Sequence, residues 1–194
     1  MIGEFTLVIP VKATEHAKSR LDLGPDARTS VMRSFVEHTL DVAASARLVG
    51  DIVVVGSMEL VPTDRELHHV PEPPRGGLNE AVGAGRSWAR LHRAGQSVAV
   101  LPVDLPHLTA DELDRALGLA AWSRRAFVAD HLGTGTTLVT ARSPELLDTA
   151  YGPGSAQAHA AMGLDQLDVG AGLRHDVDTP EDLWLVAGLI ALAG

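Results

Sequence analysis

The chain has 194 residues, of which 45% are hydrophobic and 21% charged, and it contains no cysteine. This composition is typical of a globular chain that buries a sizeable core, and we expect residues 1–194 to form one domain. The lack of cysteine excludes disulfide scaffolds, thiolate metal sites and cysteine nucleophiles. The formal net charge of −9 disfavours a general surface for nucleic acid or anionic membranes.

No run of about 18 apolar residues occurs, so the sequence predicts no membrane-spanning helix. The N-terminus also lacks a basic region followed by an apolar run, which disfavours secretion. We therefore expect a cytoplasmic protein.

Short apolar runs alternate with longer segments of helical periodicity, which predicts an α/β fold with a mostly parallel central sheet and helices on both faces. A capping box at Thr109 and Glu112 marks one helix start, and Pro180 after Thr179 marks another. The expected strands are 6–11, 51–56, 97–102, 126–129 and 136–141, with a further short one at 68–70. The expected helices are 26–46, 79–94, 109–121 and a last one from 179 to near the C-terminus.

Ligands of open α/β sheets bind beyond the carboxyl ends of the strands, so the residues that follow each strand are the candidates for a site. Lys12, Lys18 and Arg20 follow the first expected strand and include both lysines of the chain. Such a cation cluster in an acidic protein favours binding of a nucleoside triphosphate. A solvated basic loop is the alternative.

Two glycines, Gly76 and Gly77, precede Asn79 at the start of an expected helix. They would let the backbone approach a nucleotide, and the amides at the helix N-terminus could meet a base or phosphate. An ordinary glycine turn with a helix cap explains the segment equally well.

Asp104 stands between two prolines after the strand at 97–102. This is a suitable place for a Mg²⁺ ligand, although turns also use Asp there.

Two Gly-rich segments, residues 130–137 and 152–155, carry backbone amides and hydroxyls that could cradle a small phosphorylated acid. In particular, the amides of four glycines are expected to be exposed, namely Gly133, Gly135, Gly152 and Gly154. A plain hairpin and a Gly-rich helix start are the alternatives.

Asp176 and Asp178 alternate along a short extended run, so both carboxylates would face one side. Together with Asp104, they could hold two Mg²⁺ ions. Helix capping is the competing interpretation.

Several familiar motifs do not occur in the sequence. Neither the phosphate-binding GxxxxGK[ST] loop nor the dinucleotide-binding GxGxxG is found, and no GxSxG elbow of a serine hydrolase is present. The nine histidines show no zinc-binding spacing.

Taken in order, the segments IPVK, KSRL, GGLNEAV, LPVDLP, ADHLGTGTTL, YGPGSAQAHAAMG and DVDTPEDL resemble the guanylyltransferases of coenzyme F-420 biosynthesis. Those enzymes act on 2-phospho-L-lactate or phosphoenolpyruvate. The resemblance runs from about residue 7 to residue 186. LPxDLP and DVDTPEDL are shared with many nucleotidyltransferases, whereas GTGTT followed by GPGS is more specific. The LxGGxGxRxxxK loop of sugar nucleotidyltransferases is absent, which favours this family.

The resemblance implies a Rossmann-like nucleotidyltransferase fold of the glycosyltransferase-A type and transfer of GMP from GTP to a phosphorylated three-carbon acid, with release of diphosphate. Position by position, it assigns three residues to the phosphorylated acid and two to the metal, with one further metal candidate. The acid-binding positions are Thr137, Gly152 and Ser155, and the metal positions are Asp104 and Asp178, with Asp176 as the further candidate.

On this basis we expect Mg²⁺, as two ions, to bridge the two phosphates, and GTP to be the co-substrate. The catalytic cations would be Lys12, Lys18 and Arg20, and the nucleotide-binding residues Lys12, Gly76, Gly77 and Asn79. The Ala-, Gly- and Arg-rich composition indicates a GC-rich, actinobacterium-like source, for which the resemblance favours phosphoenolpyruvate over 2-phospho-L-lactate.

Two alternatives stay open. One is a molybdopterin-type or sugar-phosphate nucleotidyltransferase of the same fold, and the other is a non-catalytic module that binds phosphometabolites. The resemblance also implies that homodimers occur in the family. An unstable product would require coupling to the next enzyme of the pathway.

Overall fold

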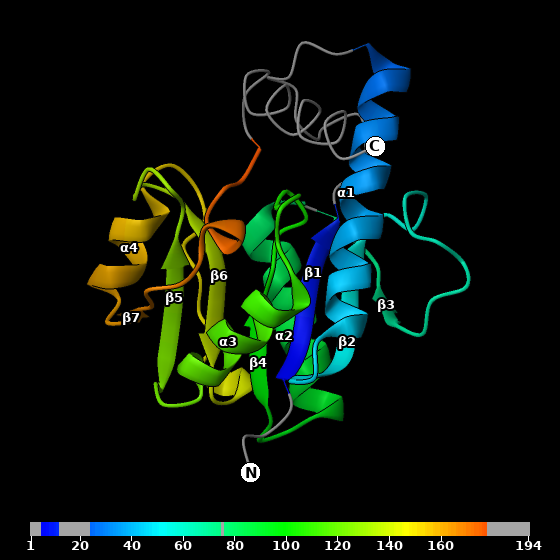
Figure 1. Ribbon diagram of the computed structural model, residues 1–194. Coiled ribbons are helices and arrows are strands. Elements are labelled where there is room, and N and C mark those ends of the chain that lie inside the picture. The colour runs from blue at the N-terminus through cyan, green and yellow to red at the C-terminus, as the bar shows by residue number, and fades with distance from the viewer. Residues whose placement is uncertain (1–4, 12–23, 75, 178–194) are drawn as a thin grey trace.

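The computed structural model describes residues 5–11, 24–74 and 76–177 (Figure 1). Within these residues, seven strands form one sheet in the order β3-β2-β1-β4-β6-β5-β7. The strands are β1 (Phe5–Val11), β2 (Val49–Gly56), β3 (His68–Val70), β4 (Ser97–Val100), β5 (Arg125–Ala129), β6 (Thr136–Ala141) and β7 (Asp165–Gln166). The helices are α1 (Pro25–Ser45), α2 (Leu78–His92), α3 (Ala110–Ala120) and α4 (Ser155–Ala161), with short 3₁₀ helices η3 (Pro144–Leu146) and η4 (Ala171–Leu173).

The sheet is mostly parallel, as the alternating pattern predicted. β1 pairs in parallel with β2 and β4, β2 with β3, and β5 with β7. β6 runs antiparallel to both of its neighbours, β4 and β5. The segment from β5 to β6 is therefore a hairpin, and both of its inner ends lie at the edge where the parallel strands finish.

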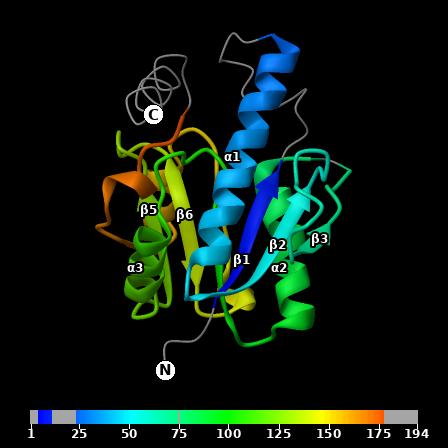
Figure 2. The same ribbon diagram turned by 45° about the vertical axis from the view of Figure 1, so that its right-hand side comes forward.

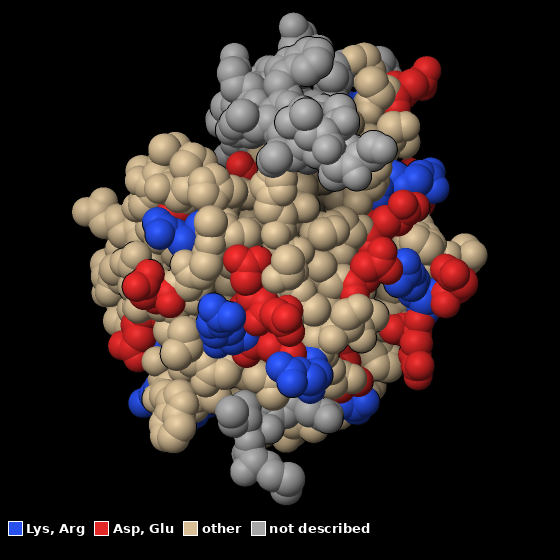
Figure 3. Space-filling model, in the orientation of Figure 1, with Lys and Arg blue, Asp and Glu red and all other residues tan. Residues whose placement is uncertain are grey.

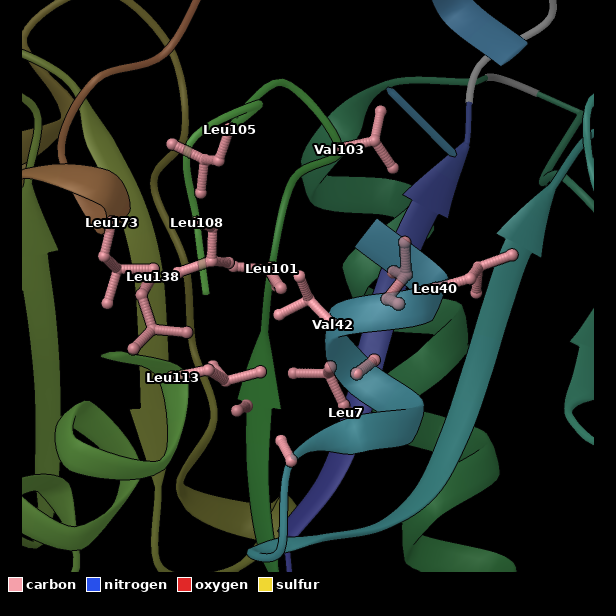
Figure 4. Packing of buried hydrophobic residues seen from close by; sticks show 14 of the residues in the cluster. Leu7, Leu40, Val42, Leu101, Val103, Leu105, Leu108, Leu113, Leu138 and Leu173 are labelled. Carbon is pink, nitrogen blue, oxygen red and sulfur yellow. The ribbon is translucent and has the colours of Figure 1, made fainter. Parts of the chain in front are cut away.

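Helices cover both faces of the sheet, because the central strands are apolar on both sides. Figure 2 shows α1 and α3 on one side and α2 on the other. The core on the α1 and α3 side includes Leu7, Leu40 and Leu101 (Figure 4). The opposite core joins α2 and α4 to the other side chains of the same strands. Gly85 of α2 belongs to this layer, since a Cβ there would lie 2.4 Å from Val8 Cγ1.

The predicted elements match the structure closely. Strand β4 ends at Val100 rather than at Pro102, although the amide of Leu101 still donates to the carbonyl of Val8 at 3.0 Å. Proline has no N–H to continue the ladder. Helix α3 has the predicted capping box between Thr109 and Glu112. The expected last helix lies outside the described residues.

The described part of the chain contains no helix that is long and apolar enough to cross a membrane. On the face shown in Figure 3, acidic side chains lie interspersed with basic ones rather than in separate areas.

Candidate functional site

The candidate site lies at the edge of the sheet where the parallel strands end. The arrowheads of β1 and β2 point to this edge in Figure 2. The segments that follow β3, β4 and β5 lie beyond it, together with the start of β6. Ligands of open α/β sheets bind at such an edge, so this is where the predicted site residues should meet.

Asp104 is held by a loop whose apolar side chains enter the core. Val103 and Leu105 are buried on either side of it (Figure 4). Thr39 Oγ1 of α1 donates to the carbonyl of Val103 at 3.3 Å. The amide of Val177 donates to the carbonyl of Asp104 at 3.0 Å. The two acidic segments predicted to hold metal therefore lie side by side.

Asp176 precedes the buried Val177, and its side chain is 18% exposed. Its Oδ1 lies 3.9 Å from Nδ1 of His131, and the His131 ring stacks on His175 with the ring centres 4.7 Å apart. The Asp176 carboxylate therefore faces an imidazole pair at the site's edge. Asp178, the other predicted ligand of this segment, lies outside the described residues.

Carboxylate oxygens of Asp104 and Asp176 are the donor type that Mg²⁺ prefers. No three His, Asp or Glu side chains within residues 5–11, 24–74 and 76–177 are grouped so that they could bind an ion by themselves. Mg²⁺ is commonly held by one or two carboxylates together with substrate phosphates and water. The described residues fit that kind of shared site.

The turn between β5 and β6 is closed by the buried carboxylate of Asp130. It accepts from the amides of Thr134 at 2.8 Å and Gly135 at 2.7 Å. The amide of Gly133 donates to the carbonyl of Asp130. The expectation that Gly133 and Gly135 expose their amides was therefore wrong, because Asp130 already accepts both. A Cβ at Gly135 would lie 2.6 Å from Asp130 Oδ2, which explains why this position has glycine.

A β-bulge at the start of β6 determines where its threonines point. The β5–β6 register pairs Val128 with Leu138 but Ala129 with Thr136, so Thr137 is the additional residue. A bulge of this kind turns a side chain away from the regular alternation. Thr137 consequently lies on the α1 and α3 side, where its buried hydroxyl donates to the carbonyl of Leu173 at 2.6 Å.

Gly152 and Gly154 shape the second Gly-rich segment. Their φ angles are +146° and +73°, values that residues with a side chain rarely adopt. The turn places the buried Ser155 at the start of α4, with its amide donating to the carbonyl of Gly152 at 3.1 Å. The next amide, that of Ala156, donates to the carbonyl of Thr134. The two predicted Gly-rich segments therefore meet.

Asn79, at the second position of α2, is tied to this same turn. Its side-chain oxygen accepts from the amide of Tyr151 at 2.9 Å and from Thr149 Oγ1 at 3.0 Å. Its side-chain nitrogen donates to the carbonyl of Tyr151 at 2.9 Å. Ahead of it, Cβ atoms at Gly76 and Gly77 would meet the carboxylate oxygens of Glu72 and Glu80. Both glutamates are exposed and can turn away, so these contacts do not by themselves require glycine.

Sequence reasoning missed two residues of this region, His159 and Tyr151. His159 is 0% exposed, and its Nε2 accepts a hydrogen bond from the amide of Ala150 at 3.0 Å. Because Nε2 accepts, the proton of the neutral ring is on Nδ1, which donates to Thr136 Oγ1 at 2.9 Å. Burial lowers the pKa of His159, which keeps the ring neutral. Its ring meets that of Tyr151 edge-on, with centres 5.4 Å apart. Their only signal in the sequence is their position: Tyr151 directly precedes the GPGS segment, and His159 follows Ser155 by four residues.

A third residue that the sequence analysis missed is Arg174. Its Nε donates to the carbonyl of Ala129 at 3.2 Å and its Nη2 to the carbonyl of Asp130 at 3.0 Å. It therefore places a positive charge beside the end of β5. The cations predicted for catalysis, Lys12, Lys18 and Arg20, lie outside the described residues.

Comparisons with known proteins show the family of the chain. A family model described as "Guanylyl transferase CofC like" matches residues 5–186. A phosphoenolpyruvate guanylyltransferase of Streptomyces scabiei is 43% identical over 199 residues, covering 96% of this chain and 91% of that protein. A protein of the same name from Sanguibacter keddieii is 41% identical over 228 residues, covering 95% of this chain and 80% of that protein.

Solved structures confirm the fold. A putative nucleotide-diphospho-sugar transferase from Desulfovibrio desulfuricans superposes with a TM-score of 0.67 at 19% identity, over 93% of this chain and 85% of that one. A 4-diphosphocytidyl-2C-methyl-D-erythritol synthase superposes with a TM-score of 0.63 at 14% identity, over 97% of this chain and 99% of that one. The fold is therefore that of nucleotidyltransferases. The chain belongs to the family of CofC-like guanylyl transferases.

Proposed function

We propose that this protein transfers GMP from GTP to phosphoenolpyruvate, with 2-phospho-L-lactate as the next candidate acceptor, and releases diphosphate in coenzyme F-420 biosynthesis. Relatives that carry the name phosphoenolpyruvate guanylyltransferase support this acceptor. The structural observation that supports it most is the meeting of the Asp104 loop, the β6 bulge and the Gly152–Ser155 turn at one sheet edge. Carboxylates suited to a metal and a turn suited to an anion are thereby placed close together.

In this proposal, the turn at Gly152 and Ser155 holds the phosphorylated acid together with Thr137. The hydroxyl of Thr137 already donates to Leu173, so we assign its contribution to the backbone at the bulge, where the ladder is interrupted. Around Gly152 and Gly154, an added Cβ would meet nothing within 4 Å, which leaves space beside the turn for a ligand.

The metal-binding part of the proposal concerns Asp104, Asp176 and Asp178. We assign these carboxylates to Mg²⁺, as two ions, with GTP as the co-substrate. When bound, Mg²⁺ would neutralise phosphate charge on both reactants. Asp104 contributes from a loop that its two buried neighbours, Val103 and Leu105, anchor in the core, which leaves little backbone reorganisation for the reaction itself.

Both reactants are anions, so charge neutralisation and positioning supply most of the rate. We assign Lys12, Lys18 and Arg20 to the β- and γ-phosphates and the departing diphosphate. Gly76 and Gly77 are assigned to the nucleotide side, whereas Asn79, which the sequence predicted there too, acts through the acceptor turn that it holds. The acceptor phosphate is already ionised at neutral pH, so the attack on the α-phosphorus of GTP requires no general base.

Steady-state release of diphosphate tests this proposal. We would incubate the protein with Mg²⁺ and GTP and add phosphoenolpyruvate, 2-phospho-L-lactate or 3-phospho-D-glycerate separately, and sugar phosphates and a molybdopterin precursor in further reactions. We expect release with phosphoenolpyruvate. Release only with sugar phosphates or a molybdopterin precursor would instead support another nucleotidyltransferase of this fold, and binding without release would support a non-catalytic module.

The matched variants are Asp104→Asn and Asp165→Asn, because Asp165 lies in β7 and is exposed. Asp104→Asn should lower kcat at least about 100-fold, since it removes a fixed charge from the proposed metal site. Asp165→Asn should leave kcat unchanged. Cytoplasmic localisation, a homodimer and coupling to the next pathway enzyme belong to the same proposal.

A further inference from the structure

Tyr151 has a buried hydroxyl that the fold itself does not use. The residue as a whole is half-buried, but its hydroxyl oxygen is fully buried and has no hydrogen-bond partner in the part of the chain that the structure describes. Burying such a hydroxyl without a partner destabilises the fold, because its bonds to water are lost. Native structures keep few such groups, and those that remain call for an explanation.

The position of this hydroxyl is fixed by its surroundings. Asn79 bonds both the amide and the carbonyl of Tyr151, which fixes the backbone. The ring meets His159 edge-on, and His159 is itself held by Ala150 and Thr136. The hydroxyl oxygen of Tyr151 is therefore held in a fixed position, although it forms no hydrogen bond within the described residues.

Two charged or anion-binding features lie near it. Tyr151 directly precedes Gly152, the first residue of the turn proposed to hold the acceptor. The hydroxyl also lies within reach of the negative charge of Asp104, and a tyrosine hydroxyl can donate a hydrogen bond. A ligand that offers an acceptor oxygen would therefore supply the missing partner.

We infer that the Tyr151 hydroxyl donates a hydrogen bond to an anionic oxygen, phosphate or carboxylate, of the phosphorylated acid bound between Asp104 and the Gly152–Ser155 turn. This inference rests on the proposed function. It makes Tyr151 a binding residue for the acceptor rather than for GTP. Asp104, through the metal it is proposed to hold, and the hydroxyl of Tyr151 would then both serve to bind the same anion.

The variant Tyr151→Phe tests this directly, with Thr6→Val as the matched control. Thr6 also has a buried hydroxyl oxygen without a partner among the described residues, but it lies near the beginning of β1, at the opposite edge of the sheet. Each substitution removes one orphaned hydroxyl and preserves the rest of the shape. Neither variant should melt at a lower temperature than the wild type.

We expect Tyr151→Phe to raise the KM for phosphoenolpyruvate about 10-fold or more, because bonds to charged groups are among the stronger ones. The KM for GTP should stay within about twofold, and Thr6→Val should behave as the wild type. An unchanged KM for the acceptor, or an increase confined to GTP, would overturn the inference while leaving guanylyl transfer intact. If the wild type itself transfers to no phosphorylated acid, the proposed function fails and the inference fails with it.

A second measurement uses the fact that Tyr151 is the only tyrosine of the chain. Labelling with ¹³Cζ-tyrosine gives a single resonance that reports hydrogen bonding of this hydroxyl in the wild type, without relying on any variant. The resonance should shift when phosphoenolpyruvate is added with Mg²⁺ and should stay in place with Mg²⁺ and GTP alone. No shift at an acceptor concentration that raises the melting temperature would overturn the inference.

Discussion

The side-chain amide of Asn79 bonds both backbone groups of Tyr151, 72 positions further along the chain, at 2.9 Å each. The N-terminus of α2 is thereby attached to the turn that precedes α4. The sequence placed Asn79 on the nucleotide side, whereas its observed partners belong to the turn proposed to hold the acceptor. The two assignments predict different effects of a substitution.

Asn79→Asp keeps an oxygen that accepts from the Tyr151 amide, but it replaces the donor to the Tyr151 carbonyl by a second oxygen. We expect a loss of about 1–3 kcal/mol in the free energy of unfolding, measured by urea titration. The KM for the acceptor should rise several-fold and the KM for GTP should change little. The opposite pattern would show that Asn79 acts on the nucleotide directly.

His159 should make stability depend on pH. Burial lowers its pKa from 6.5, so below about pH 6.5 the unfolded chain takes up a proton that the folded protein does not. Unfolding is therefore favoured as the pH falls through this window, by at most about 1.4 kcal/mol per pH unit. His159→Gln lacks this titration and loses the bond between Nδ1 and Thr136.

Urea titrations of both proteins from pH 8 to pH 5 measure this effect, with the other eight histidines common to both. The wild type should be more stable by about 1–3 kcal/mol at pH 8, and its advantage should shrink toward pH 5. A stability difference that stays constant over this range would argue against a neutral, buried His159.

Gly154 and Gly95 form a matched pair for testing the turn. Their φ angles are +73° and +79°, and a Cβ at either would have open space around it. Alanine at either position should therefore destabilise the fold by a similar amount, about 1–2 kcal/mol, through backbone strain alone. Gly95 lies between α2 and β4, at the edge opposite the candidate site.

Only Gly154→Ala should raise the KM for the phosphorylated acid, because only this strain distorts the proposed acceptor turn. The measurement is the KM for the phosphorylated acid, determined for both alanine variants at equal folded fractions. Equal KM values for the two variants would show that the Gly152–Ser155 turn does not bind the acceptor.

Asp51 joins the end of α2 to β2 through a two-pronged contact with Arg93, at 2.7 Å for both Nε–Oδ2 and Nη2–Oδ1. The hydrogen bond from Arg93, with a smaller one from His68, holds the pKa of Asp51 below its usual value of 3.8. A lowered pKa means that the contact stabilises the fold above about pH 4 and is lost as the pH falls through the folded-state pKa.

Asp51→Asn should lower the melting temperature at pH 7, and the difference from the wild type should fade toward pH 3. Asp41→Asn is the control, because Asp41 is 60% exposed in its ion pair with Arg65, and exposed pairs contribute little. Calorimetry at pH 7, 5 and 3 measures both. Equal melting temperatures for the two variants at pH 7 would contradict the role given to Asp51.

The strands and long helices were predictable because their signals are local. β1, α1, α2, α3, β5 and β6 follow apolar periodicity, and the capping box marks the start of α3. Helix α4 was foreseen only as the alternative interpretation of residues 152–155, a Gly-rich helix start, because it spans only seven residues. Strand β7 has only two residues and pairs with β5, a contact that no local pattern encodes.

The candidate site was predictable only in part, for a similar reason. The position of Asp104 at a strand end follows from the fold, and the nearness of the segment around Val177 is confirmed. The partners of Asn79 and His159 lie on other elements and could not be read from spacing. The closure of the turn by Asp130 had a local signal, since Asp often accepts from amides a few residues ahead, and this would have corrected the expectation for Gly133 and Gly135.

The most direct measurement follows the α-phosphorus of GTP. We would incubate the protein with Mg²⁺, phosphoenolpyruvate and GTP labelled with ³²P at the α-phosphate, and then identify the labelled species by chromatography and mass. We predict a labelled product with the mass of guanylylated phosphoenolpyruvate, formed one-to-one with diphosphate and at least about 100-fold more slowly with Asp104→Asn. Label recovered only as GTP, free GMP or GDP, with phosphoenolpyruvate unchanged and the protein folded, would contradict this prediction.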